Sequence, residues 1–296
     1  MKRFGWITLC TALALAGGCA SEEDEWDTDV LSHGYDSSEL EVLRKGRDAY
    51  GIYCVGCHGE EGDGEGPAAR FLNPKPRDFR SGLIKFALVP AGELPRDEDL
   101  LDVITHGLDG TSMPSWRLVP LEERHAIVAY IKTFSDKYQT KSPGAPVVLG
   151  KDPWRNDPAG GIAEGERVYH GIAGCYTCHP AYVTKAKMTQ HLASYDIVVE
   201  GFREDLYQPI AKESQWGADI LPPDFLFHRI KTGFQHERVV RVISAGVGGT
   251  AMPTWAGGLQ PRQLWGLAHY VESLALERGT PEGAAHRRSL LDQDNR

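Results

Sequence analysis

The sequence predicts a helical protein made of two similar halves in tandem, and two observations support this prediction. Residues 104–116, ITHGLDGTSMPSW, match residues 243–255, ISAGVGGTAMPTW, at seven of thirteen positions without a gap. Behind each copy, at 121–134 and 260–276, apolar residues recur at the spacing of a helix with one buried face. A repeat of this kind indicates two copies of one folding unit.

A second pair of matching segments extends the repeat. PRDFRSGLIK at 76–85 aligns without a gap on PPDFLFHRIK at 222–231, with Pro, Asp, Phe, Ile and Lys shared. Further upstream, each half has a helical segment in which a glycine precedes a tyrosine by four residues. These pairs are Gly46 with Tyr50 and Gly165 with Tyr169. Both halves therefore contain the same segments in the same order.

The composition favours a packed protein and gives no indication of a nucleic-acid partner. The chain has 296 residues, of which 41% are hydrophobic and 25% charged, a balance typical of globular domains. Its 32 basic and 41 acidic residues give a net charge of −9, and no long basic run occurs. We therefore expect no nucleic acid among its partners.

The N-terminus has the features of an export signal. Two basic residues precede an apolar stretch at 4–18, which is too short to cross a bilayer. The stretch ends at Cys19, which resembles the lipidated cysteine of bacterial lipoprotein signals, whereas ordinary cleavage after Ala20 would remove this cysteine. We favour lipidation, which would anchor the protein on the periplasmic side of a membrane. Because residue 20 is not aspartate, the outer membrane is favoured over the inner membrane.

Four of the six cysteines lie in two copies of the pentapeptide C-x-x-C-H. The copies are Cys54-Val55-Gly56-Cys57-His58 and Cys175-Tyr176-Thr177-Cys178-His179. This is the attachment motif of c-type haem, in which both thiols bond to the porphyrin vinyl groups and the adjacent histidine reaches the iron. Three other interpretations explain the pattern less well. A thioredoxin-like pair needs a βαβ context, which is not visible, and a zinc site does not require the adjacent histidine. A disulfide within such a short segment would add little stability. We therefore expect two covalently bound haem c groups.

The second axial ligand of each iron is expected to be a methionine. Met113 and Met252 each lie in the repeated Gly-Thr-x-Met-Pro-x-Trp loop, downstream of a haem motif. Met188 lacks that loop, so we assign it to a packed core. The predicted iron ligands are therefore His58 with Met113 and His179 with Met252, the combination that raises a haem potential.

With these motifs in this order, the sequence resembles class I cytochrome c twice over. The closest likeness is to tandem dihaem cytochromes of bacterial respiratory chains and to the cytochrome domains of the third subunit of cbb3-type oxidases. The resemblance implies an all-α fold of two tandem class I cytochrome c domains, each wrapped around one covalently attached haem. In each domain an N-terminal helix would cross a C-terminal helix.

The resemblance also implies roles for residues around each haem. A proline carbonyl behind the haem motif would orient the ligating histidine, a position that Pro67 offers in the first half and no residue matches in the second. Trp116 and Trp255 would pack beside the haems. Candidates for contacts with the haem carboxylates are Arg77, Lys85 and Lys231.

Composition and repeat together predict the organisation of the chain. The expected parts are an export signal at 1–18, an extended acidic tether at 19–37, a first cytochrome c domain at 38–135, a Pro- and Gly-rich linker at 136–160, a second domain at 161–276 and a polar surface or disordered tail at 277–296. An insertion at about 180–221 distinguishes the second domain and would form either a docking surface or a neutral elaboration of the surface.

The resemblance implies a function in electron transfer. We expect a dihaem cytochrome that relays electrons between periplasmic or membrane redox proteins, as its donor and acceptor, within a respiratory chain. Two alternatives share the motifs: a dihaem cytochrome c peroxidase, and an electron-entry or docking subunit of a larger membrane complex. A peroxidase needs one iron with an open position for its substrate, so a methionine in each half favours the carrier over the enzyme.

Overall fold

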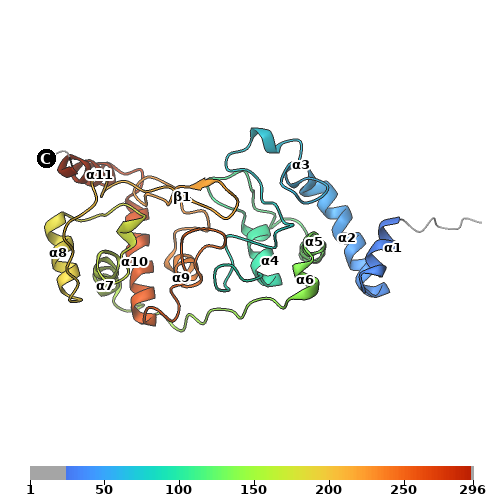
Figure 1. Cartoon of the computed structure of the whole chain (residues 1–296), viewed down its shortest axis with the longest axis horizontal. Coiled ribbons are helices and arrows are strands. Elements are labelled where there is room, and N and C mark those ends of the chain that lie inside the picture. The colour runs from blue at the N-terminus through green and yellow to red at the C-terminus, as the bar shows by residue number, and fades with distance from the viewer. Residues whose placement is uncertain (1–24, 295–296) are drawn as a thin grey trace, which may run out of the picture. The chain divides into compact units, whose positions relative to one another are not determined.

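The computed structural model describes residues 25–294 and is mostly helical, as predicted, with 45% of residues in helices and 2% in strands (Figure 1). In chain order the helices are α1 Glu25–Ser32, α2 Ser37–Tyr53, α3 Val55–His58, η1 Ala69–Phe71, α4 Asp97–His106, α5 Leu121–Thr133, α6 Lys137–Thr140, α7 Pro158–His170, η2 Cys175–Thr177, α8 Lys185–Ala193, α9 His236–Ala245, α10 Pro261–Glu277 and α11 Pro281–Asp294. Two short strands, β1 Lys212–Glu213 and β2 Asp219–Ile220, pair in antiparallel fashion. The predicted export signal and Cys19 lie outside the described residues.

The chain divides into two compact units, Met1–Glu41 and Val42–Arg296. Within the first, residues 25–32 form α1, so this part of the tether is not extended as predicted. Acidic residues at the start of a helix are stabilised by its partial positive charge, which offsets their mutual repulsion. The carboxylate of Asp36 accepts hydrogen bonds from the backbone N–H groups of Ser38 and Glu39 at 2.8 and 2.9 Å, and this cap starts α2.

In the second unit, the same helix crossing occurs twice. Gly46 of α2 lies against the backbone of α5, where a Cβ atom would stand 2.1 Å from the carbonyl oxygen of Ala126. Gly165 of α7 lies against α10, where a Cβ atom would stand 2.0 Å from the carbonyl oxygen of Gly266. Only glycine permits so close an approach of two helix backbones. The repeated glycines of the sequence therefore position the two crossings.

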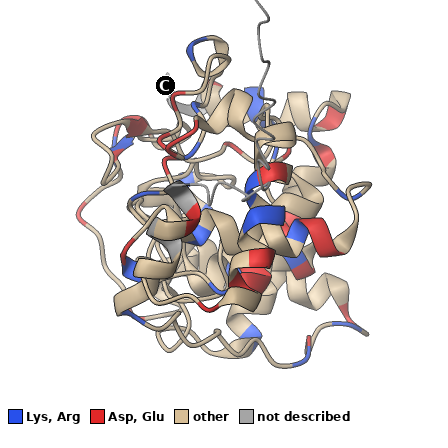
Figure 2. Cartoon of the chain, turned by 90° about the vertical axis from the view of Figure 1, so that its right-hand side faces the viewer, with Lys and Arg blue, Asp and Glu red and all other residues tan. Residues whose placement is uncertain are grey.

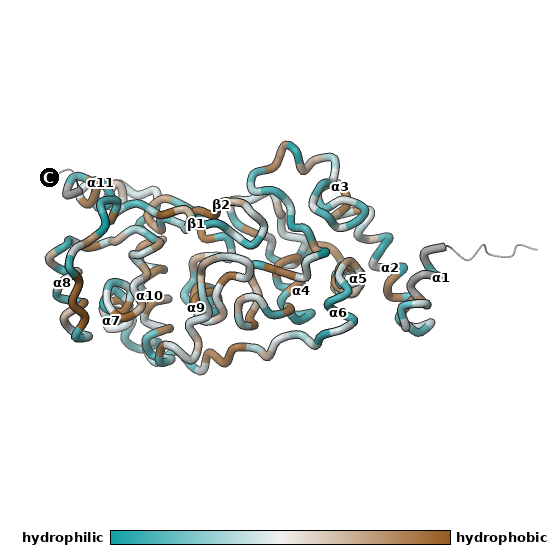
Figure 3. Tube along the Cα trace, viewed as in Figure 1, coloured by the Kyte–Doolittle hydropathy of each residue, from teal (hydrophilic) through white to brown (hydrophobic). Residues whose placement is uncertain are grey.

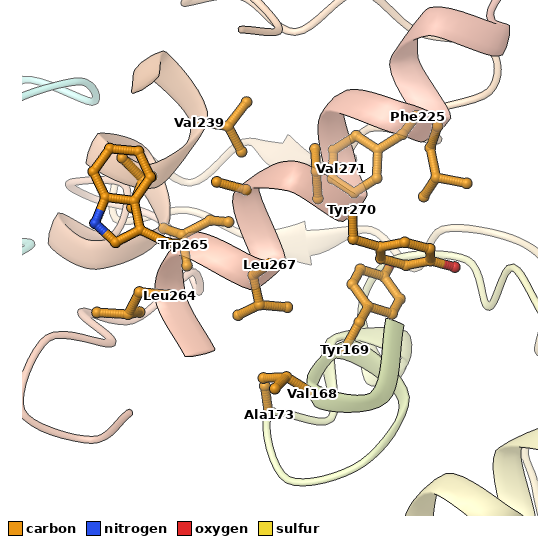
Figure 4. Packing of buried hydrophobic residues seen from close by; sticks show 14 of the residues in the cluster. Val168, Tyr169, Ala173, Phe225, Val239, Leu264, Trp265, Leu267, Tyr270 and Val271 are labelled. Carbon is orange, nitrogen blue, oxygen red and sulfur yellow. The ribbon is translucent and has the colours of Figure 1, made fainter. Parts of the chain in front are cut away.

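The tyrosines that follow these glycines pack in the same way in both crossings. The rings of Tyr50 and Tyr130 lie 5.3 Å apart, and those of Tyr169 and Tyr270 lie 5.6 Å apart, each pair edge to face. Figure 4 shows Tyr169 and Tyr270 within the buried cluster formed by α7, α9 and α10. The first tyrosine of each pair also donates a hydrogen bond to the carbonyl of a residue just after the haem motif, Gly59 or Pro180, at 2.8 Å. Each helix crossing therefore lies beside its haem motif and contacts it directly.

Replacing Gly46 by alanine is expected to lower the free energy of unfolding by about 3 kcal/mol or more. The added methyl group would overlap the backbone of α5, so the two packed helices would have to move apart. Gly51, on the same helix, is exposed and has no atom within 4 Å of the position of a Cβ atom. Gly51→Ala is the matched control and should stabilise the protein by about 0.4–1 kcal/mol. Urea denaturation of both variants measures the difference, and equal stabilities would contradict the predicted backbone contact.

Residues 136–160, predicted as a linker, pack against the second half of the chain. The indole N–H of Trp154 donates to the carbonyl oxygen of Arg262 at 2.8 Å. The indole N–H of Trp265 donates in return to the carbonyl oxygen of Leu149 at 3.1 Å. Helix α7 already begins within the last residues of this segment. Specific hydrogen bonds therefore hold this segment against the second half of the chain, and its prolines restrict its backbone.

The C-terminal tail, predicted to be surface or disordered at 277–296, contains the helix α11. Leu290 of this helix is buried beside Met188, which itself is fully buried, as expected of a core methionine. Arg287 forms an ion pair of 2.7 Å with the buried carboxylate of Asp224. These contacts join residues far apart in sequence, so local composition gave no indication of the helix.

Hydropathy and charge follow the helices. Figure 3 shows hydrophobic and hydrophilic residues alternating along α4, α7 and α10, as expected where one face of each helix is buried. Figure 2 shows acidic and basic residues interspersed on the helices that face the viewer. Among the described residues, no helix has both the length and the apolar character that a membrane crossing requires.

Candidate functional site

Helix α3 brings the first haem motif to a largely apolar cavity. Cys54 directly precedes the helix, Cys57 and His58 lie within it, and all three line the cavity together with Met113. Apolar side chains from α4, from α5, from the loop between them and from the segment after η1 complete the lining, among them Leu72, Leu100, Ile104, Trp116, Ile127 and Ile131. The structure thus gathers the four predicted site residues of the first half at one cavity, with Trp116 beside them.

The ring of His58 is held by two contacts. Its Nδ1 atom lies 3.0 Å from the carbonyl oxygen of Arg77, and its ring stacks on Phe79 with centroids 4.6 Å apart. Burial lowers the pKa of His58 below its ordinary value. A neutral imidazole that donates its Nδ1–H to a carbonyl keeps the Nε2 lone pair available for a metal. The fixed ring can therefore hold an iron ion.

The second half repeats this arrangement. The Nδ1 atom of His179 lies 3.0 Å from the carbonyl oxygen of Pro223, and its ring stacks on Phe225 at 5.1 Å. Pro223 and Phe225 hold the same places in the aligned segments as their counterparts in the first half. Burial also lowers the pKa of His179. The repeated decapeptide thus supplies both the orienting carbonyl and the stacking ring.

This geometry corrects the expectation for Pro67. The carbonyl that orients His58 belongs to Arg77, nineteen residues along the chain, and in the second half the same role falls to Pro223. Residues 64–66 instead fold back on the haem motif, since Gly66 donates a backbone hydrogen bond to the carbonyl oxygen of Cys57 at 3.2 Å. The two residues whose carbonyls orient the histidines, Arg77 and Pro223, hold the same place in the aligned segments 76–85 and 222–231. The alignment therefore offered a better candidate than the Gly-x-Gly-Pro motif.

The two methionine loops have the same backbone structure. The backbone N–H of Leu108 donates to the carbonyl oxygen of Met113 at 3.0 Å, and that of Val247 donates to Met252 at 3.2 Å. In each loop the threonine two residues before the methionine receives a hydrogen bond from the methionine N–H, at 3.1 Å in the first and 3.2 Å in the second. Both methionines are half-buried. The shared motif therefore fixes one loop geometry in both halves.

Glycines with positive φ make these loops possible. Gly107 has a φ of 69° and Gly246 a φ of 79°, each at the end of the preceding helix. A Cβ atom at either position would also come within 2.7 Å of the backbone of Pro114 or Pro253. The helix end and the methionine segment can thus lie in contact only because both glycines lack a side chain.

The four cysteines of the two motifs are all half-buried, and in the described residues none forms a disulfide. Burial raises the pKa of the Cys54 thiol to about 12, and it does the same for Cys175. A buried, protonated thiol is poorly suited to nucleophilic or redox chemistry. The environment agrees better with covalent attachment to an apolar group than with a reactive thiol pair.

Three cations converge on the rim of the first cavity. Arg77 and Lys85 of the first half and Lys231 of the second all line it. Burial, with repulsion from the other cations, lowers the pKa of Lys85 to about 8, and burial followed by Arg77 lowers that of Lys231. Within residues 25–294 no carboxylate lies within 4 Å of any of the three side chains. Such a set of half-buried positive charges is suited to bind an anionic group.

Trp216, in the turn between β1 and β2, belongs to the same cluster. The guanidinium of Arg77 lies 3.8 Å from the centre of its ring, and the Lys85 ammonium lies 5.5 Å from it. The indole Nε1–H is buried and, among residues 25–294, has no hydrogen-bond partner. An unpaired donor beside two cations is suited to bind an anionic group such as a haem carboxylate, the role expected of Arg77, Lys85 and Lys231 from the sequence. Nothing in the sequence around Trp216 indicated this position.

The most deeply buried of the other histidines has a structural role. His170 has no exposed surface, and burial lowers its pKa to about 3. Its Nδ1–H donates to the carbonyl oxygen of Glu166 at 2.9 Å, and its Nε2 accepts from the backbone N–H of Tyr182 at 3.1 Å. Both ring nitrogens are therefore occupied, so this histidine cannot ligate an iron.

Comparison with known proteins agrees with the geometry of the first half. Residues 41–131 match the family model described as "Cytochrome C oxidase, cbb3-type, subunit III", so this segment is a cytochrome c domain. The chain is similar to a chain in the solved structure of the Kuenenia stuttgartiensis reducing HAO-like protein complex Kustc0457/Kustc0458. The two are 31% identical with a TM-score of 0.63, over 78% of this chain and 95% of that chain. No curated protein matches the sequence.

Proposed function

The chain belongs to the same protein family as the matched chain of the Kuenenia complex, and from this premise we propose that it is a dihaem c-type cytochrome that transfers electrons. The cytochrome c domain at 41–131 implies at least one covalent haem c. The observation that supports a second haem is the repeated site. Histidine, orienting carbonyl, stacked phenylalanine and methionine loop recur in the second half, and the contact between histidine Nδ1 and the carbonyl oxygen measures 3.0 Å in both halves.

In this proposal each set of residues has a defined role. Cys54 with Cys57, and Cys175 with Cys178, hold a haem c by thioether bonds, and the haem iron supplies one-electron oxidation and reduction when bound. The histidine and the methionine of each half would both ligate the iron. Two protein ligands would keep the site nearly unchanged between the oxidised and reduced states, which suits electron transfer, and would leave no open position for a substrate.

Contacts between the two halves support electron transfer from one site to the other. Four polar contacts join residues 42–135 to residues 222–254: Gly248 N–H to Lys85 O at 3.0 Å, Asp109 N–H to Lys231 O at 2.8 Å, Ala91 N–H to Thr254 Oγ1 at 2.9 Å, and the Arg238–Asp102 ion pair at 2.6 Å. Trp216 lies between Arg77, which orients His58, and Gly249 of the second methionine loop. The two iron-binding regions thus share packed side chains and backbone hydrogen bonds.

The proposed domains keep the boundaries expected from the sequence, with cytochrome c domains at 38–135 and 161–276. The proposed partner is a larger redox enzyme, because the similar chain comes from a complex with an HAO-like protein. We place the protein on the periplasmic side of a membrane, held by a lipid on Cys19. The intact mass of the native protein reports whether Cys19 carries acyl groups.

The test of the proposed function distinguishes an electron carrier from a peroxidase. The reduced, unmodified protein should bind far less than one equivalent of carbon monoxide, since both axial positions are filled. The same preparation should reduce hydrogen peroxide no faster than free haem and should exchange electrons rapidly with a small redox protein. Stoichiometric binding of carbon monoxide at one haem, together with enzymatic turnover of peroxide, would refute the carrier and support the peroxidase.

A further inference from the structure

Three side chains outside both haem sites converge where the segment between the halves meets α9 and α10. They are Asp152 of that segment, His236 at the start of α9 and His269 within α10, and one donor atom from each lies within 4.8 Å of the other two. The side chains are 10%, 25% and 5% exposed, respectively. Three separate elements thus bring metal-ligating groups together in a largely shielded place.

The hydrogen bonds of the cluster direct one nitrogen of His236 toward negative charge. Its Nδ1 lies 2.7 Å from the carboxylate of Glu272, which accepts the Nδ1–H. In the neutral ring the Nε2 atom then carries a lone pair, and it lies 3.9 Å from a carboxylate oxygen of Asp152 and 3.1 Å from one of Glu237. A lone pair facing two carboxylates is repulsive unless a proton or a metal cation lies between them.

We propose that Asp152, His236 and His269 bind a divalent transition metal ion, for which zinc is the probe. Two imidazole nitrogens and one carboxylate oxygen are common zinc ligands, and Glu237 or a water molecule would complete four. Glu272 is the outer carboxylate that orients His236 and increases its basicity, as at many histidine–zinc sites. Donor atoms on a tetrahedral zinc lie about 3.3 Å apart, so shifts of about 1 Å close the site.

The bound ion would join the segment between the halves to α9 and α10. Asp152 already lies 2.9 Å from Nε2 of His269, so the ion would take the place of the proton between these two atoms and keep the same two elements joined. The ring of His236 stacks on that of His269 with centroids 4.3 Å apart, so the two imidazoles lie side by side near the carboxylate of Asp152. The site is thus structural, and it is independent of haem ligation.

The experiment measures zinc in the full-length protein with its haems attached. After treatment with a chelator, loading with zinc chloride and desalting, elemental analysis distinguishes zinc from haem iron. The unmodified protein should retain one zinc per chain, and His236→Gln should retain none. Glu272→Gln should weaken zinc binding about 10–100-fold. His125→Gln, which removes an exposed histidine on α5, is the matched control and should retain one zinc.

Thermal unfolding provides a second readout, because an ion that binds only the folded chain raises the midpoint. Zinc should raise the midpoint of the unmodified protein and of His125→Gln, but not that of His236→Gln. His269 is left unchanged because it is buried within α10. Failure of the unmodified protein to retain zinc, or equal retention by His236→Gln, would overturn the proposal and leave Asp152, His236 and His269 as hydrogen-bonded side chains that bind no metal. The count of haems and their potentials would be unaffected by that result.

Discussion

Replacement of Met113 by alanine is expected to lower the potential of one haem by on the order of 0.1–0.3 V, a fraction of the ~0.8 V that axial ligands span. A thioether ligand would stabilise the reduced iron, and the loop that contains Met113 is fixed by hydrogen bonds and by Gly107. Without the sulfur, water or hydroxide would take the position. Met252→Ala should have the same effect on the other haem.

Spectroelectrochemical titration measures both potentials in each variant. The oxidised protein should lose half of its sulfur-to-iron absorption band in either single variant and all of it in the double variant. The opened haem should also admit carbon monoxide. Met188→Leu is the matched control, because that methionine is fully buried in a packed cluster and should leave both potentials unchanged. An unchanged potential after Met113→Ala would contradict the predicted ligation.

Substitution of both cysteines of one motif is expected to remove one haem completely. In the double variant Cys54→Ala, Cys57→Ala, no thiol of the first half remains for attachment, while Cys175 and Cys178 keep theirs. Mass spectrometry of the denatured protein should show two covalent haems in the unmodified chain and one in the variant. The reciprocal double variant in the second half should also retain one haem.

The same measurement tests the repeat itself. If the second motif were an accident of composition, the unmodified protein would carry one covalent haem and substitution of Cys175 and Cys178 would change nothing. Because the cavity of the first half is lined mainly by apolar side chains, loss of its haem should also lower the stability of that half. Two haems in the first double variant would exclude the predicted attachment.

The parts of the site that lie in short, repeated segments could be predicted from the sequence. The structure places Cys54, Cys57, His58 and Met113 around one cavity, because two motifs and a helix crossing bring them there. The paired glycines Gly46 and Gly165 are also visible as a repeat in the sequence, and the structure places both where two helix backbones touch. These features depend on local spacing, and local spacing is visible in a sequence.

The parts that depend on contacts between distant segments could not be predicted. Trp216 lies in an insertion with no counterpart in the first half, yet its ring lies against Arg77. The contacts that fasten helix α11 include the buried Leu290 and the ion pair of Arg287 with Asp224, which composition does not reveal. The sequence predicts that the carbonyl of Pro67, in a short motif close to the haem motif, orients His58. The structure shows that the carbonyl of Arg77, nineteen residues from His58, has this role.

The hydrogen bond from His179 to the carbonyl of Pro223 spans 44 residues, whereas its counterpart from His58 spans 19. Both ends of the longer segment are therefore fixed at the same histidine ring, and the residues between them form a closed loop. Both contacts measure 3.0 Å, so the additional residues of the longer segment leave the position of the histidine ring unchanged. These residues include Trp216, whose ring lies against Arg77, so the longer loop of one half also packs against the other half.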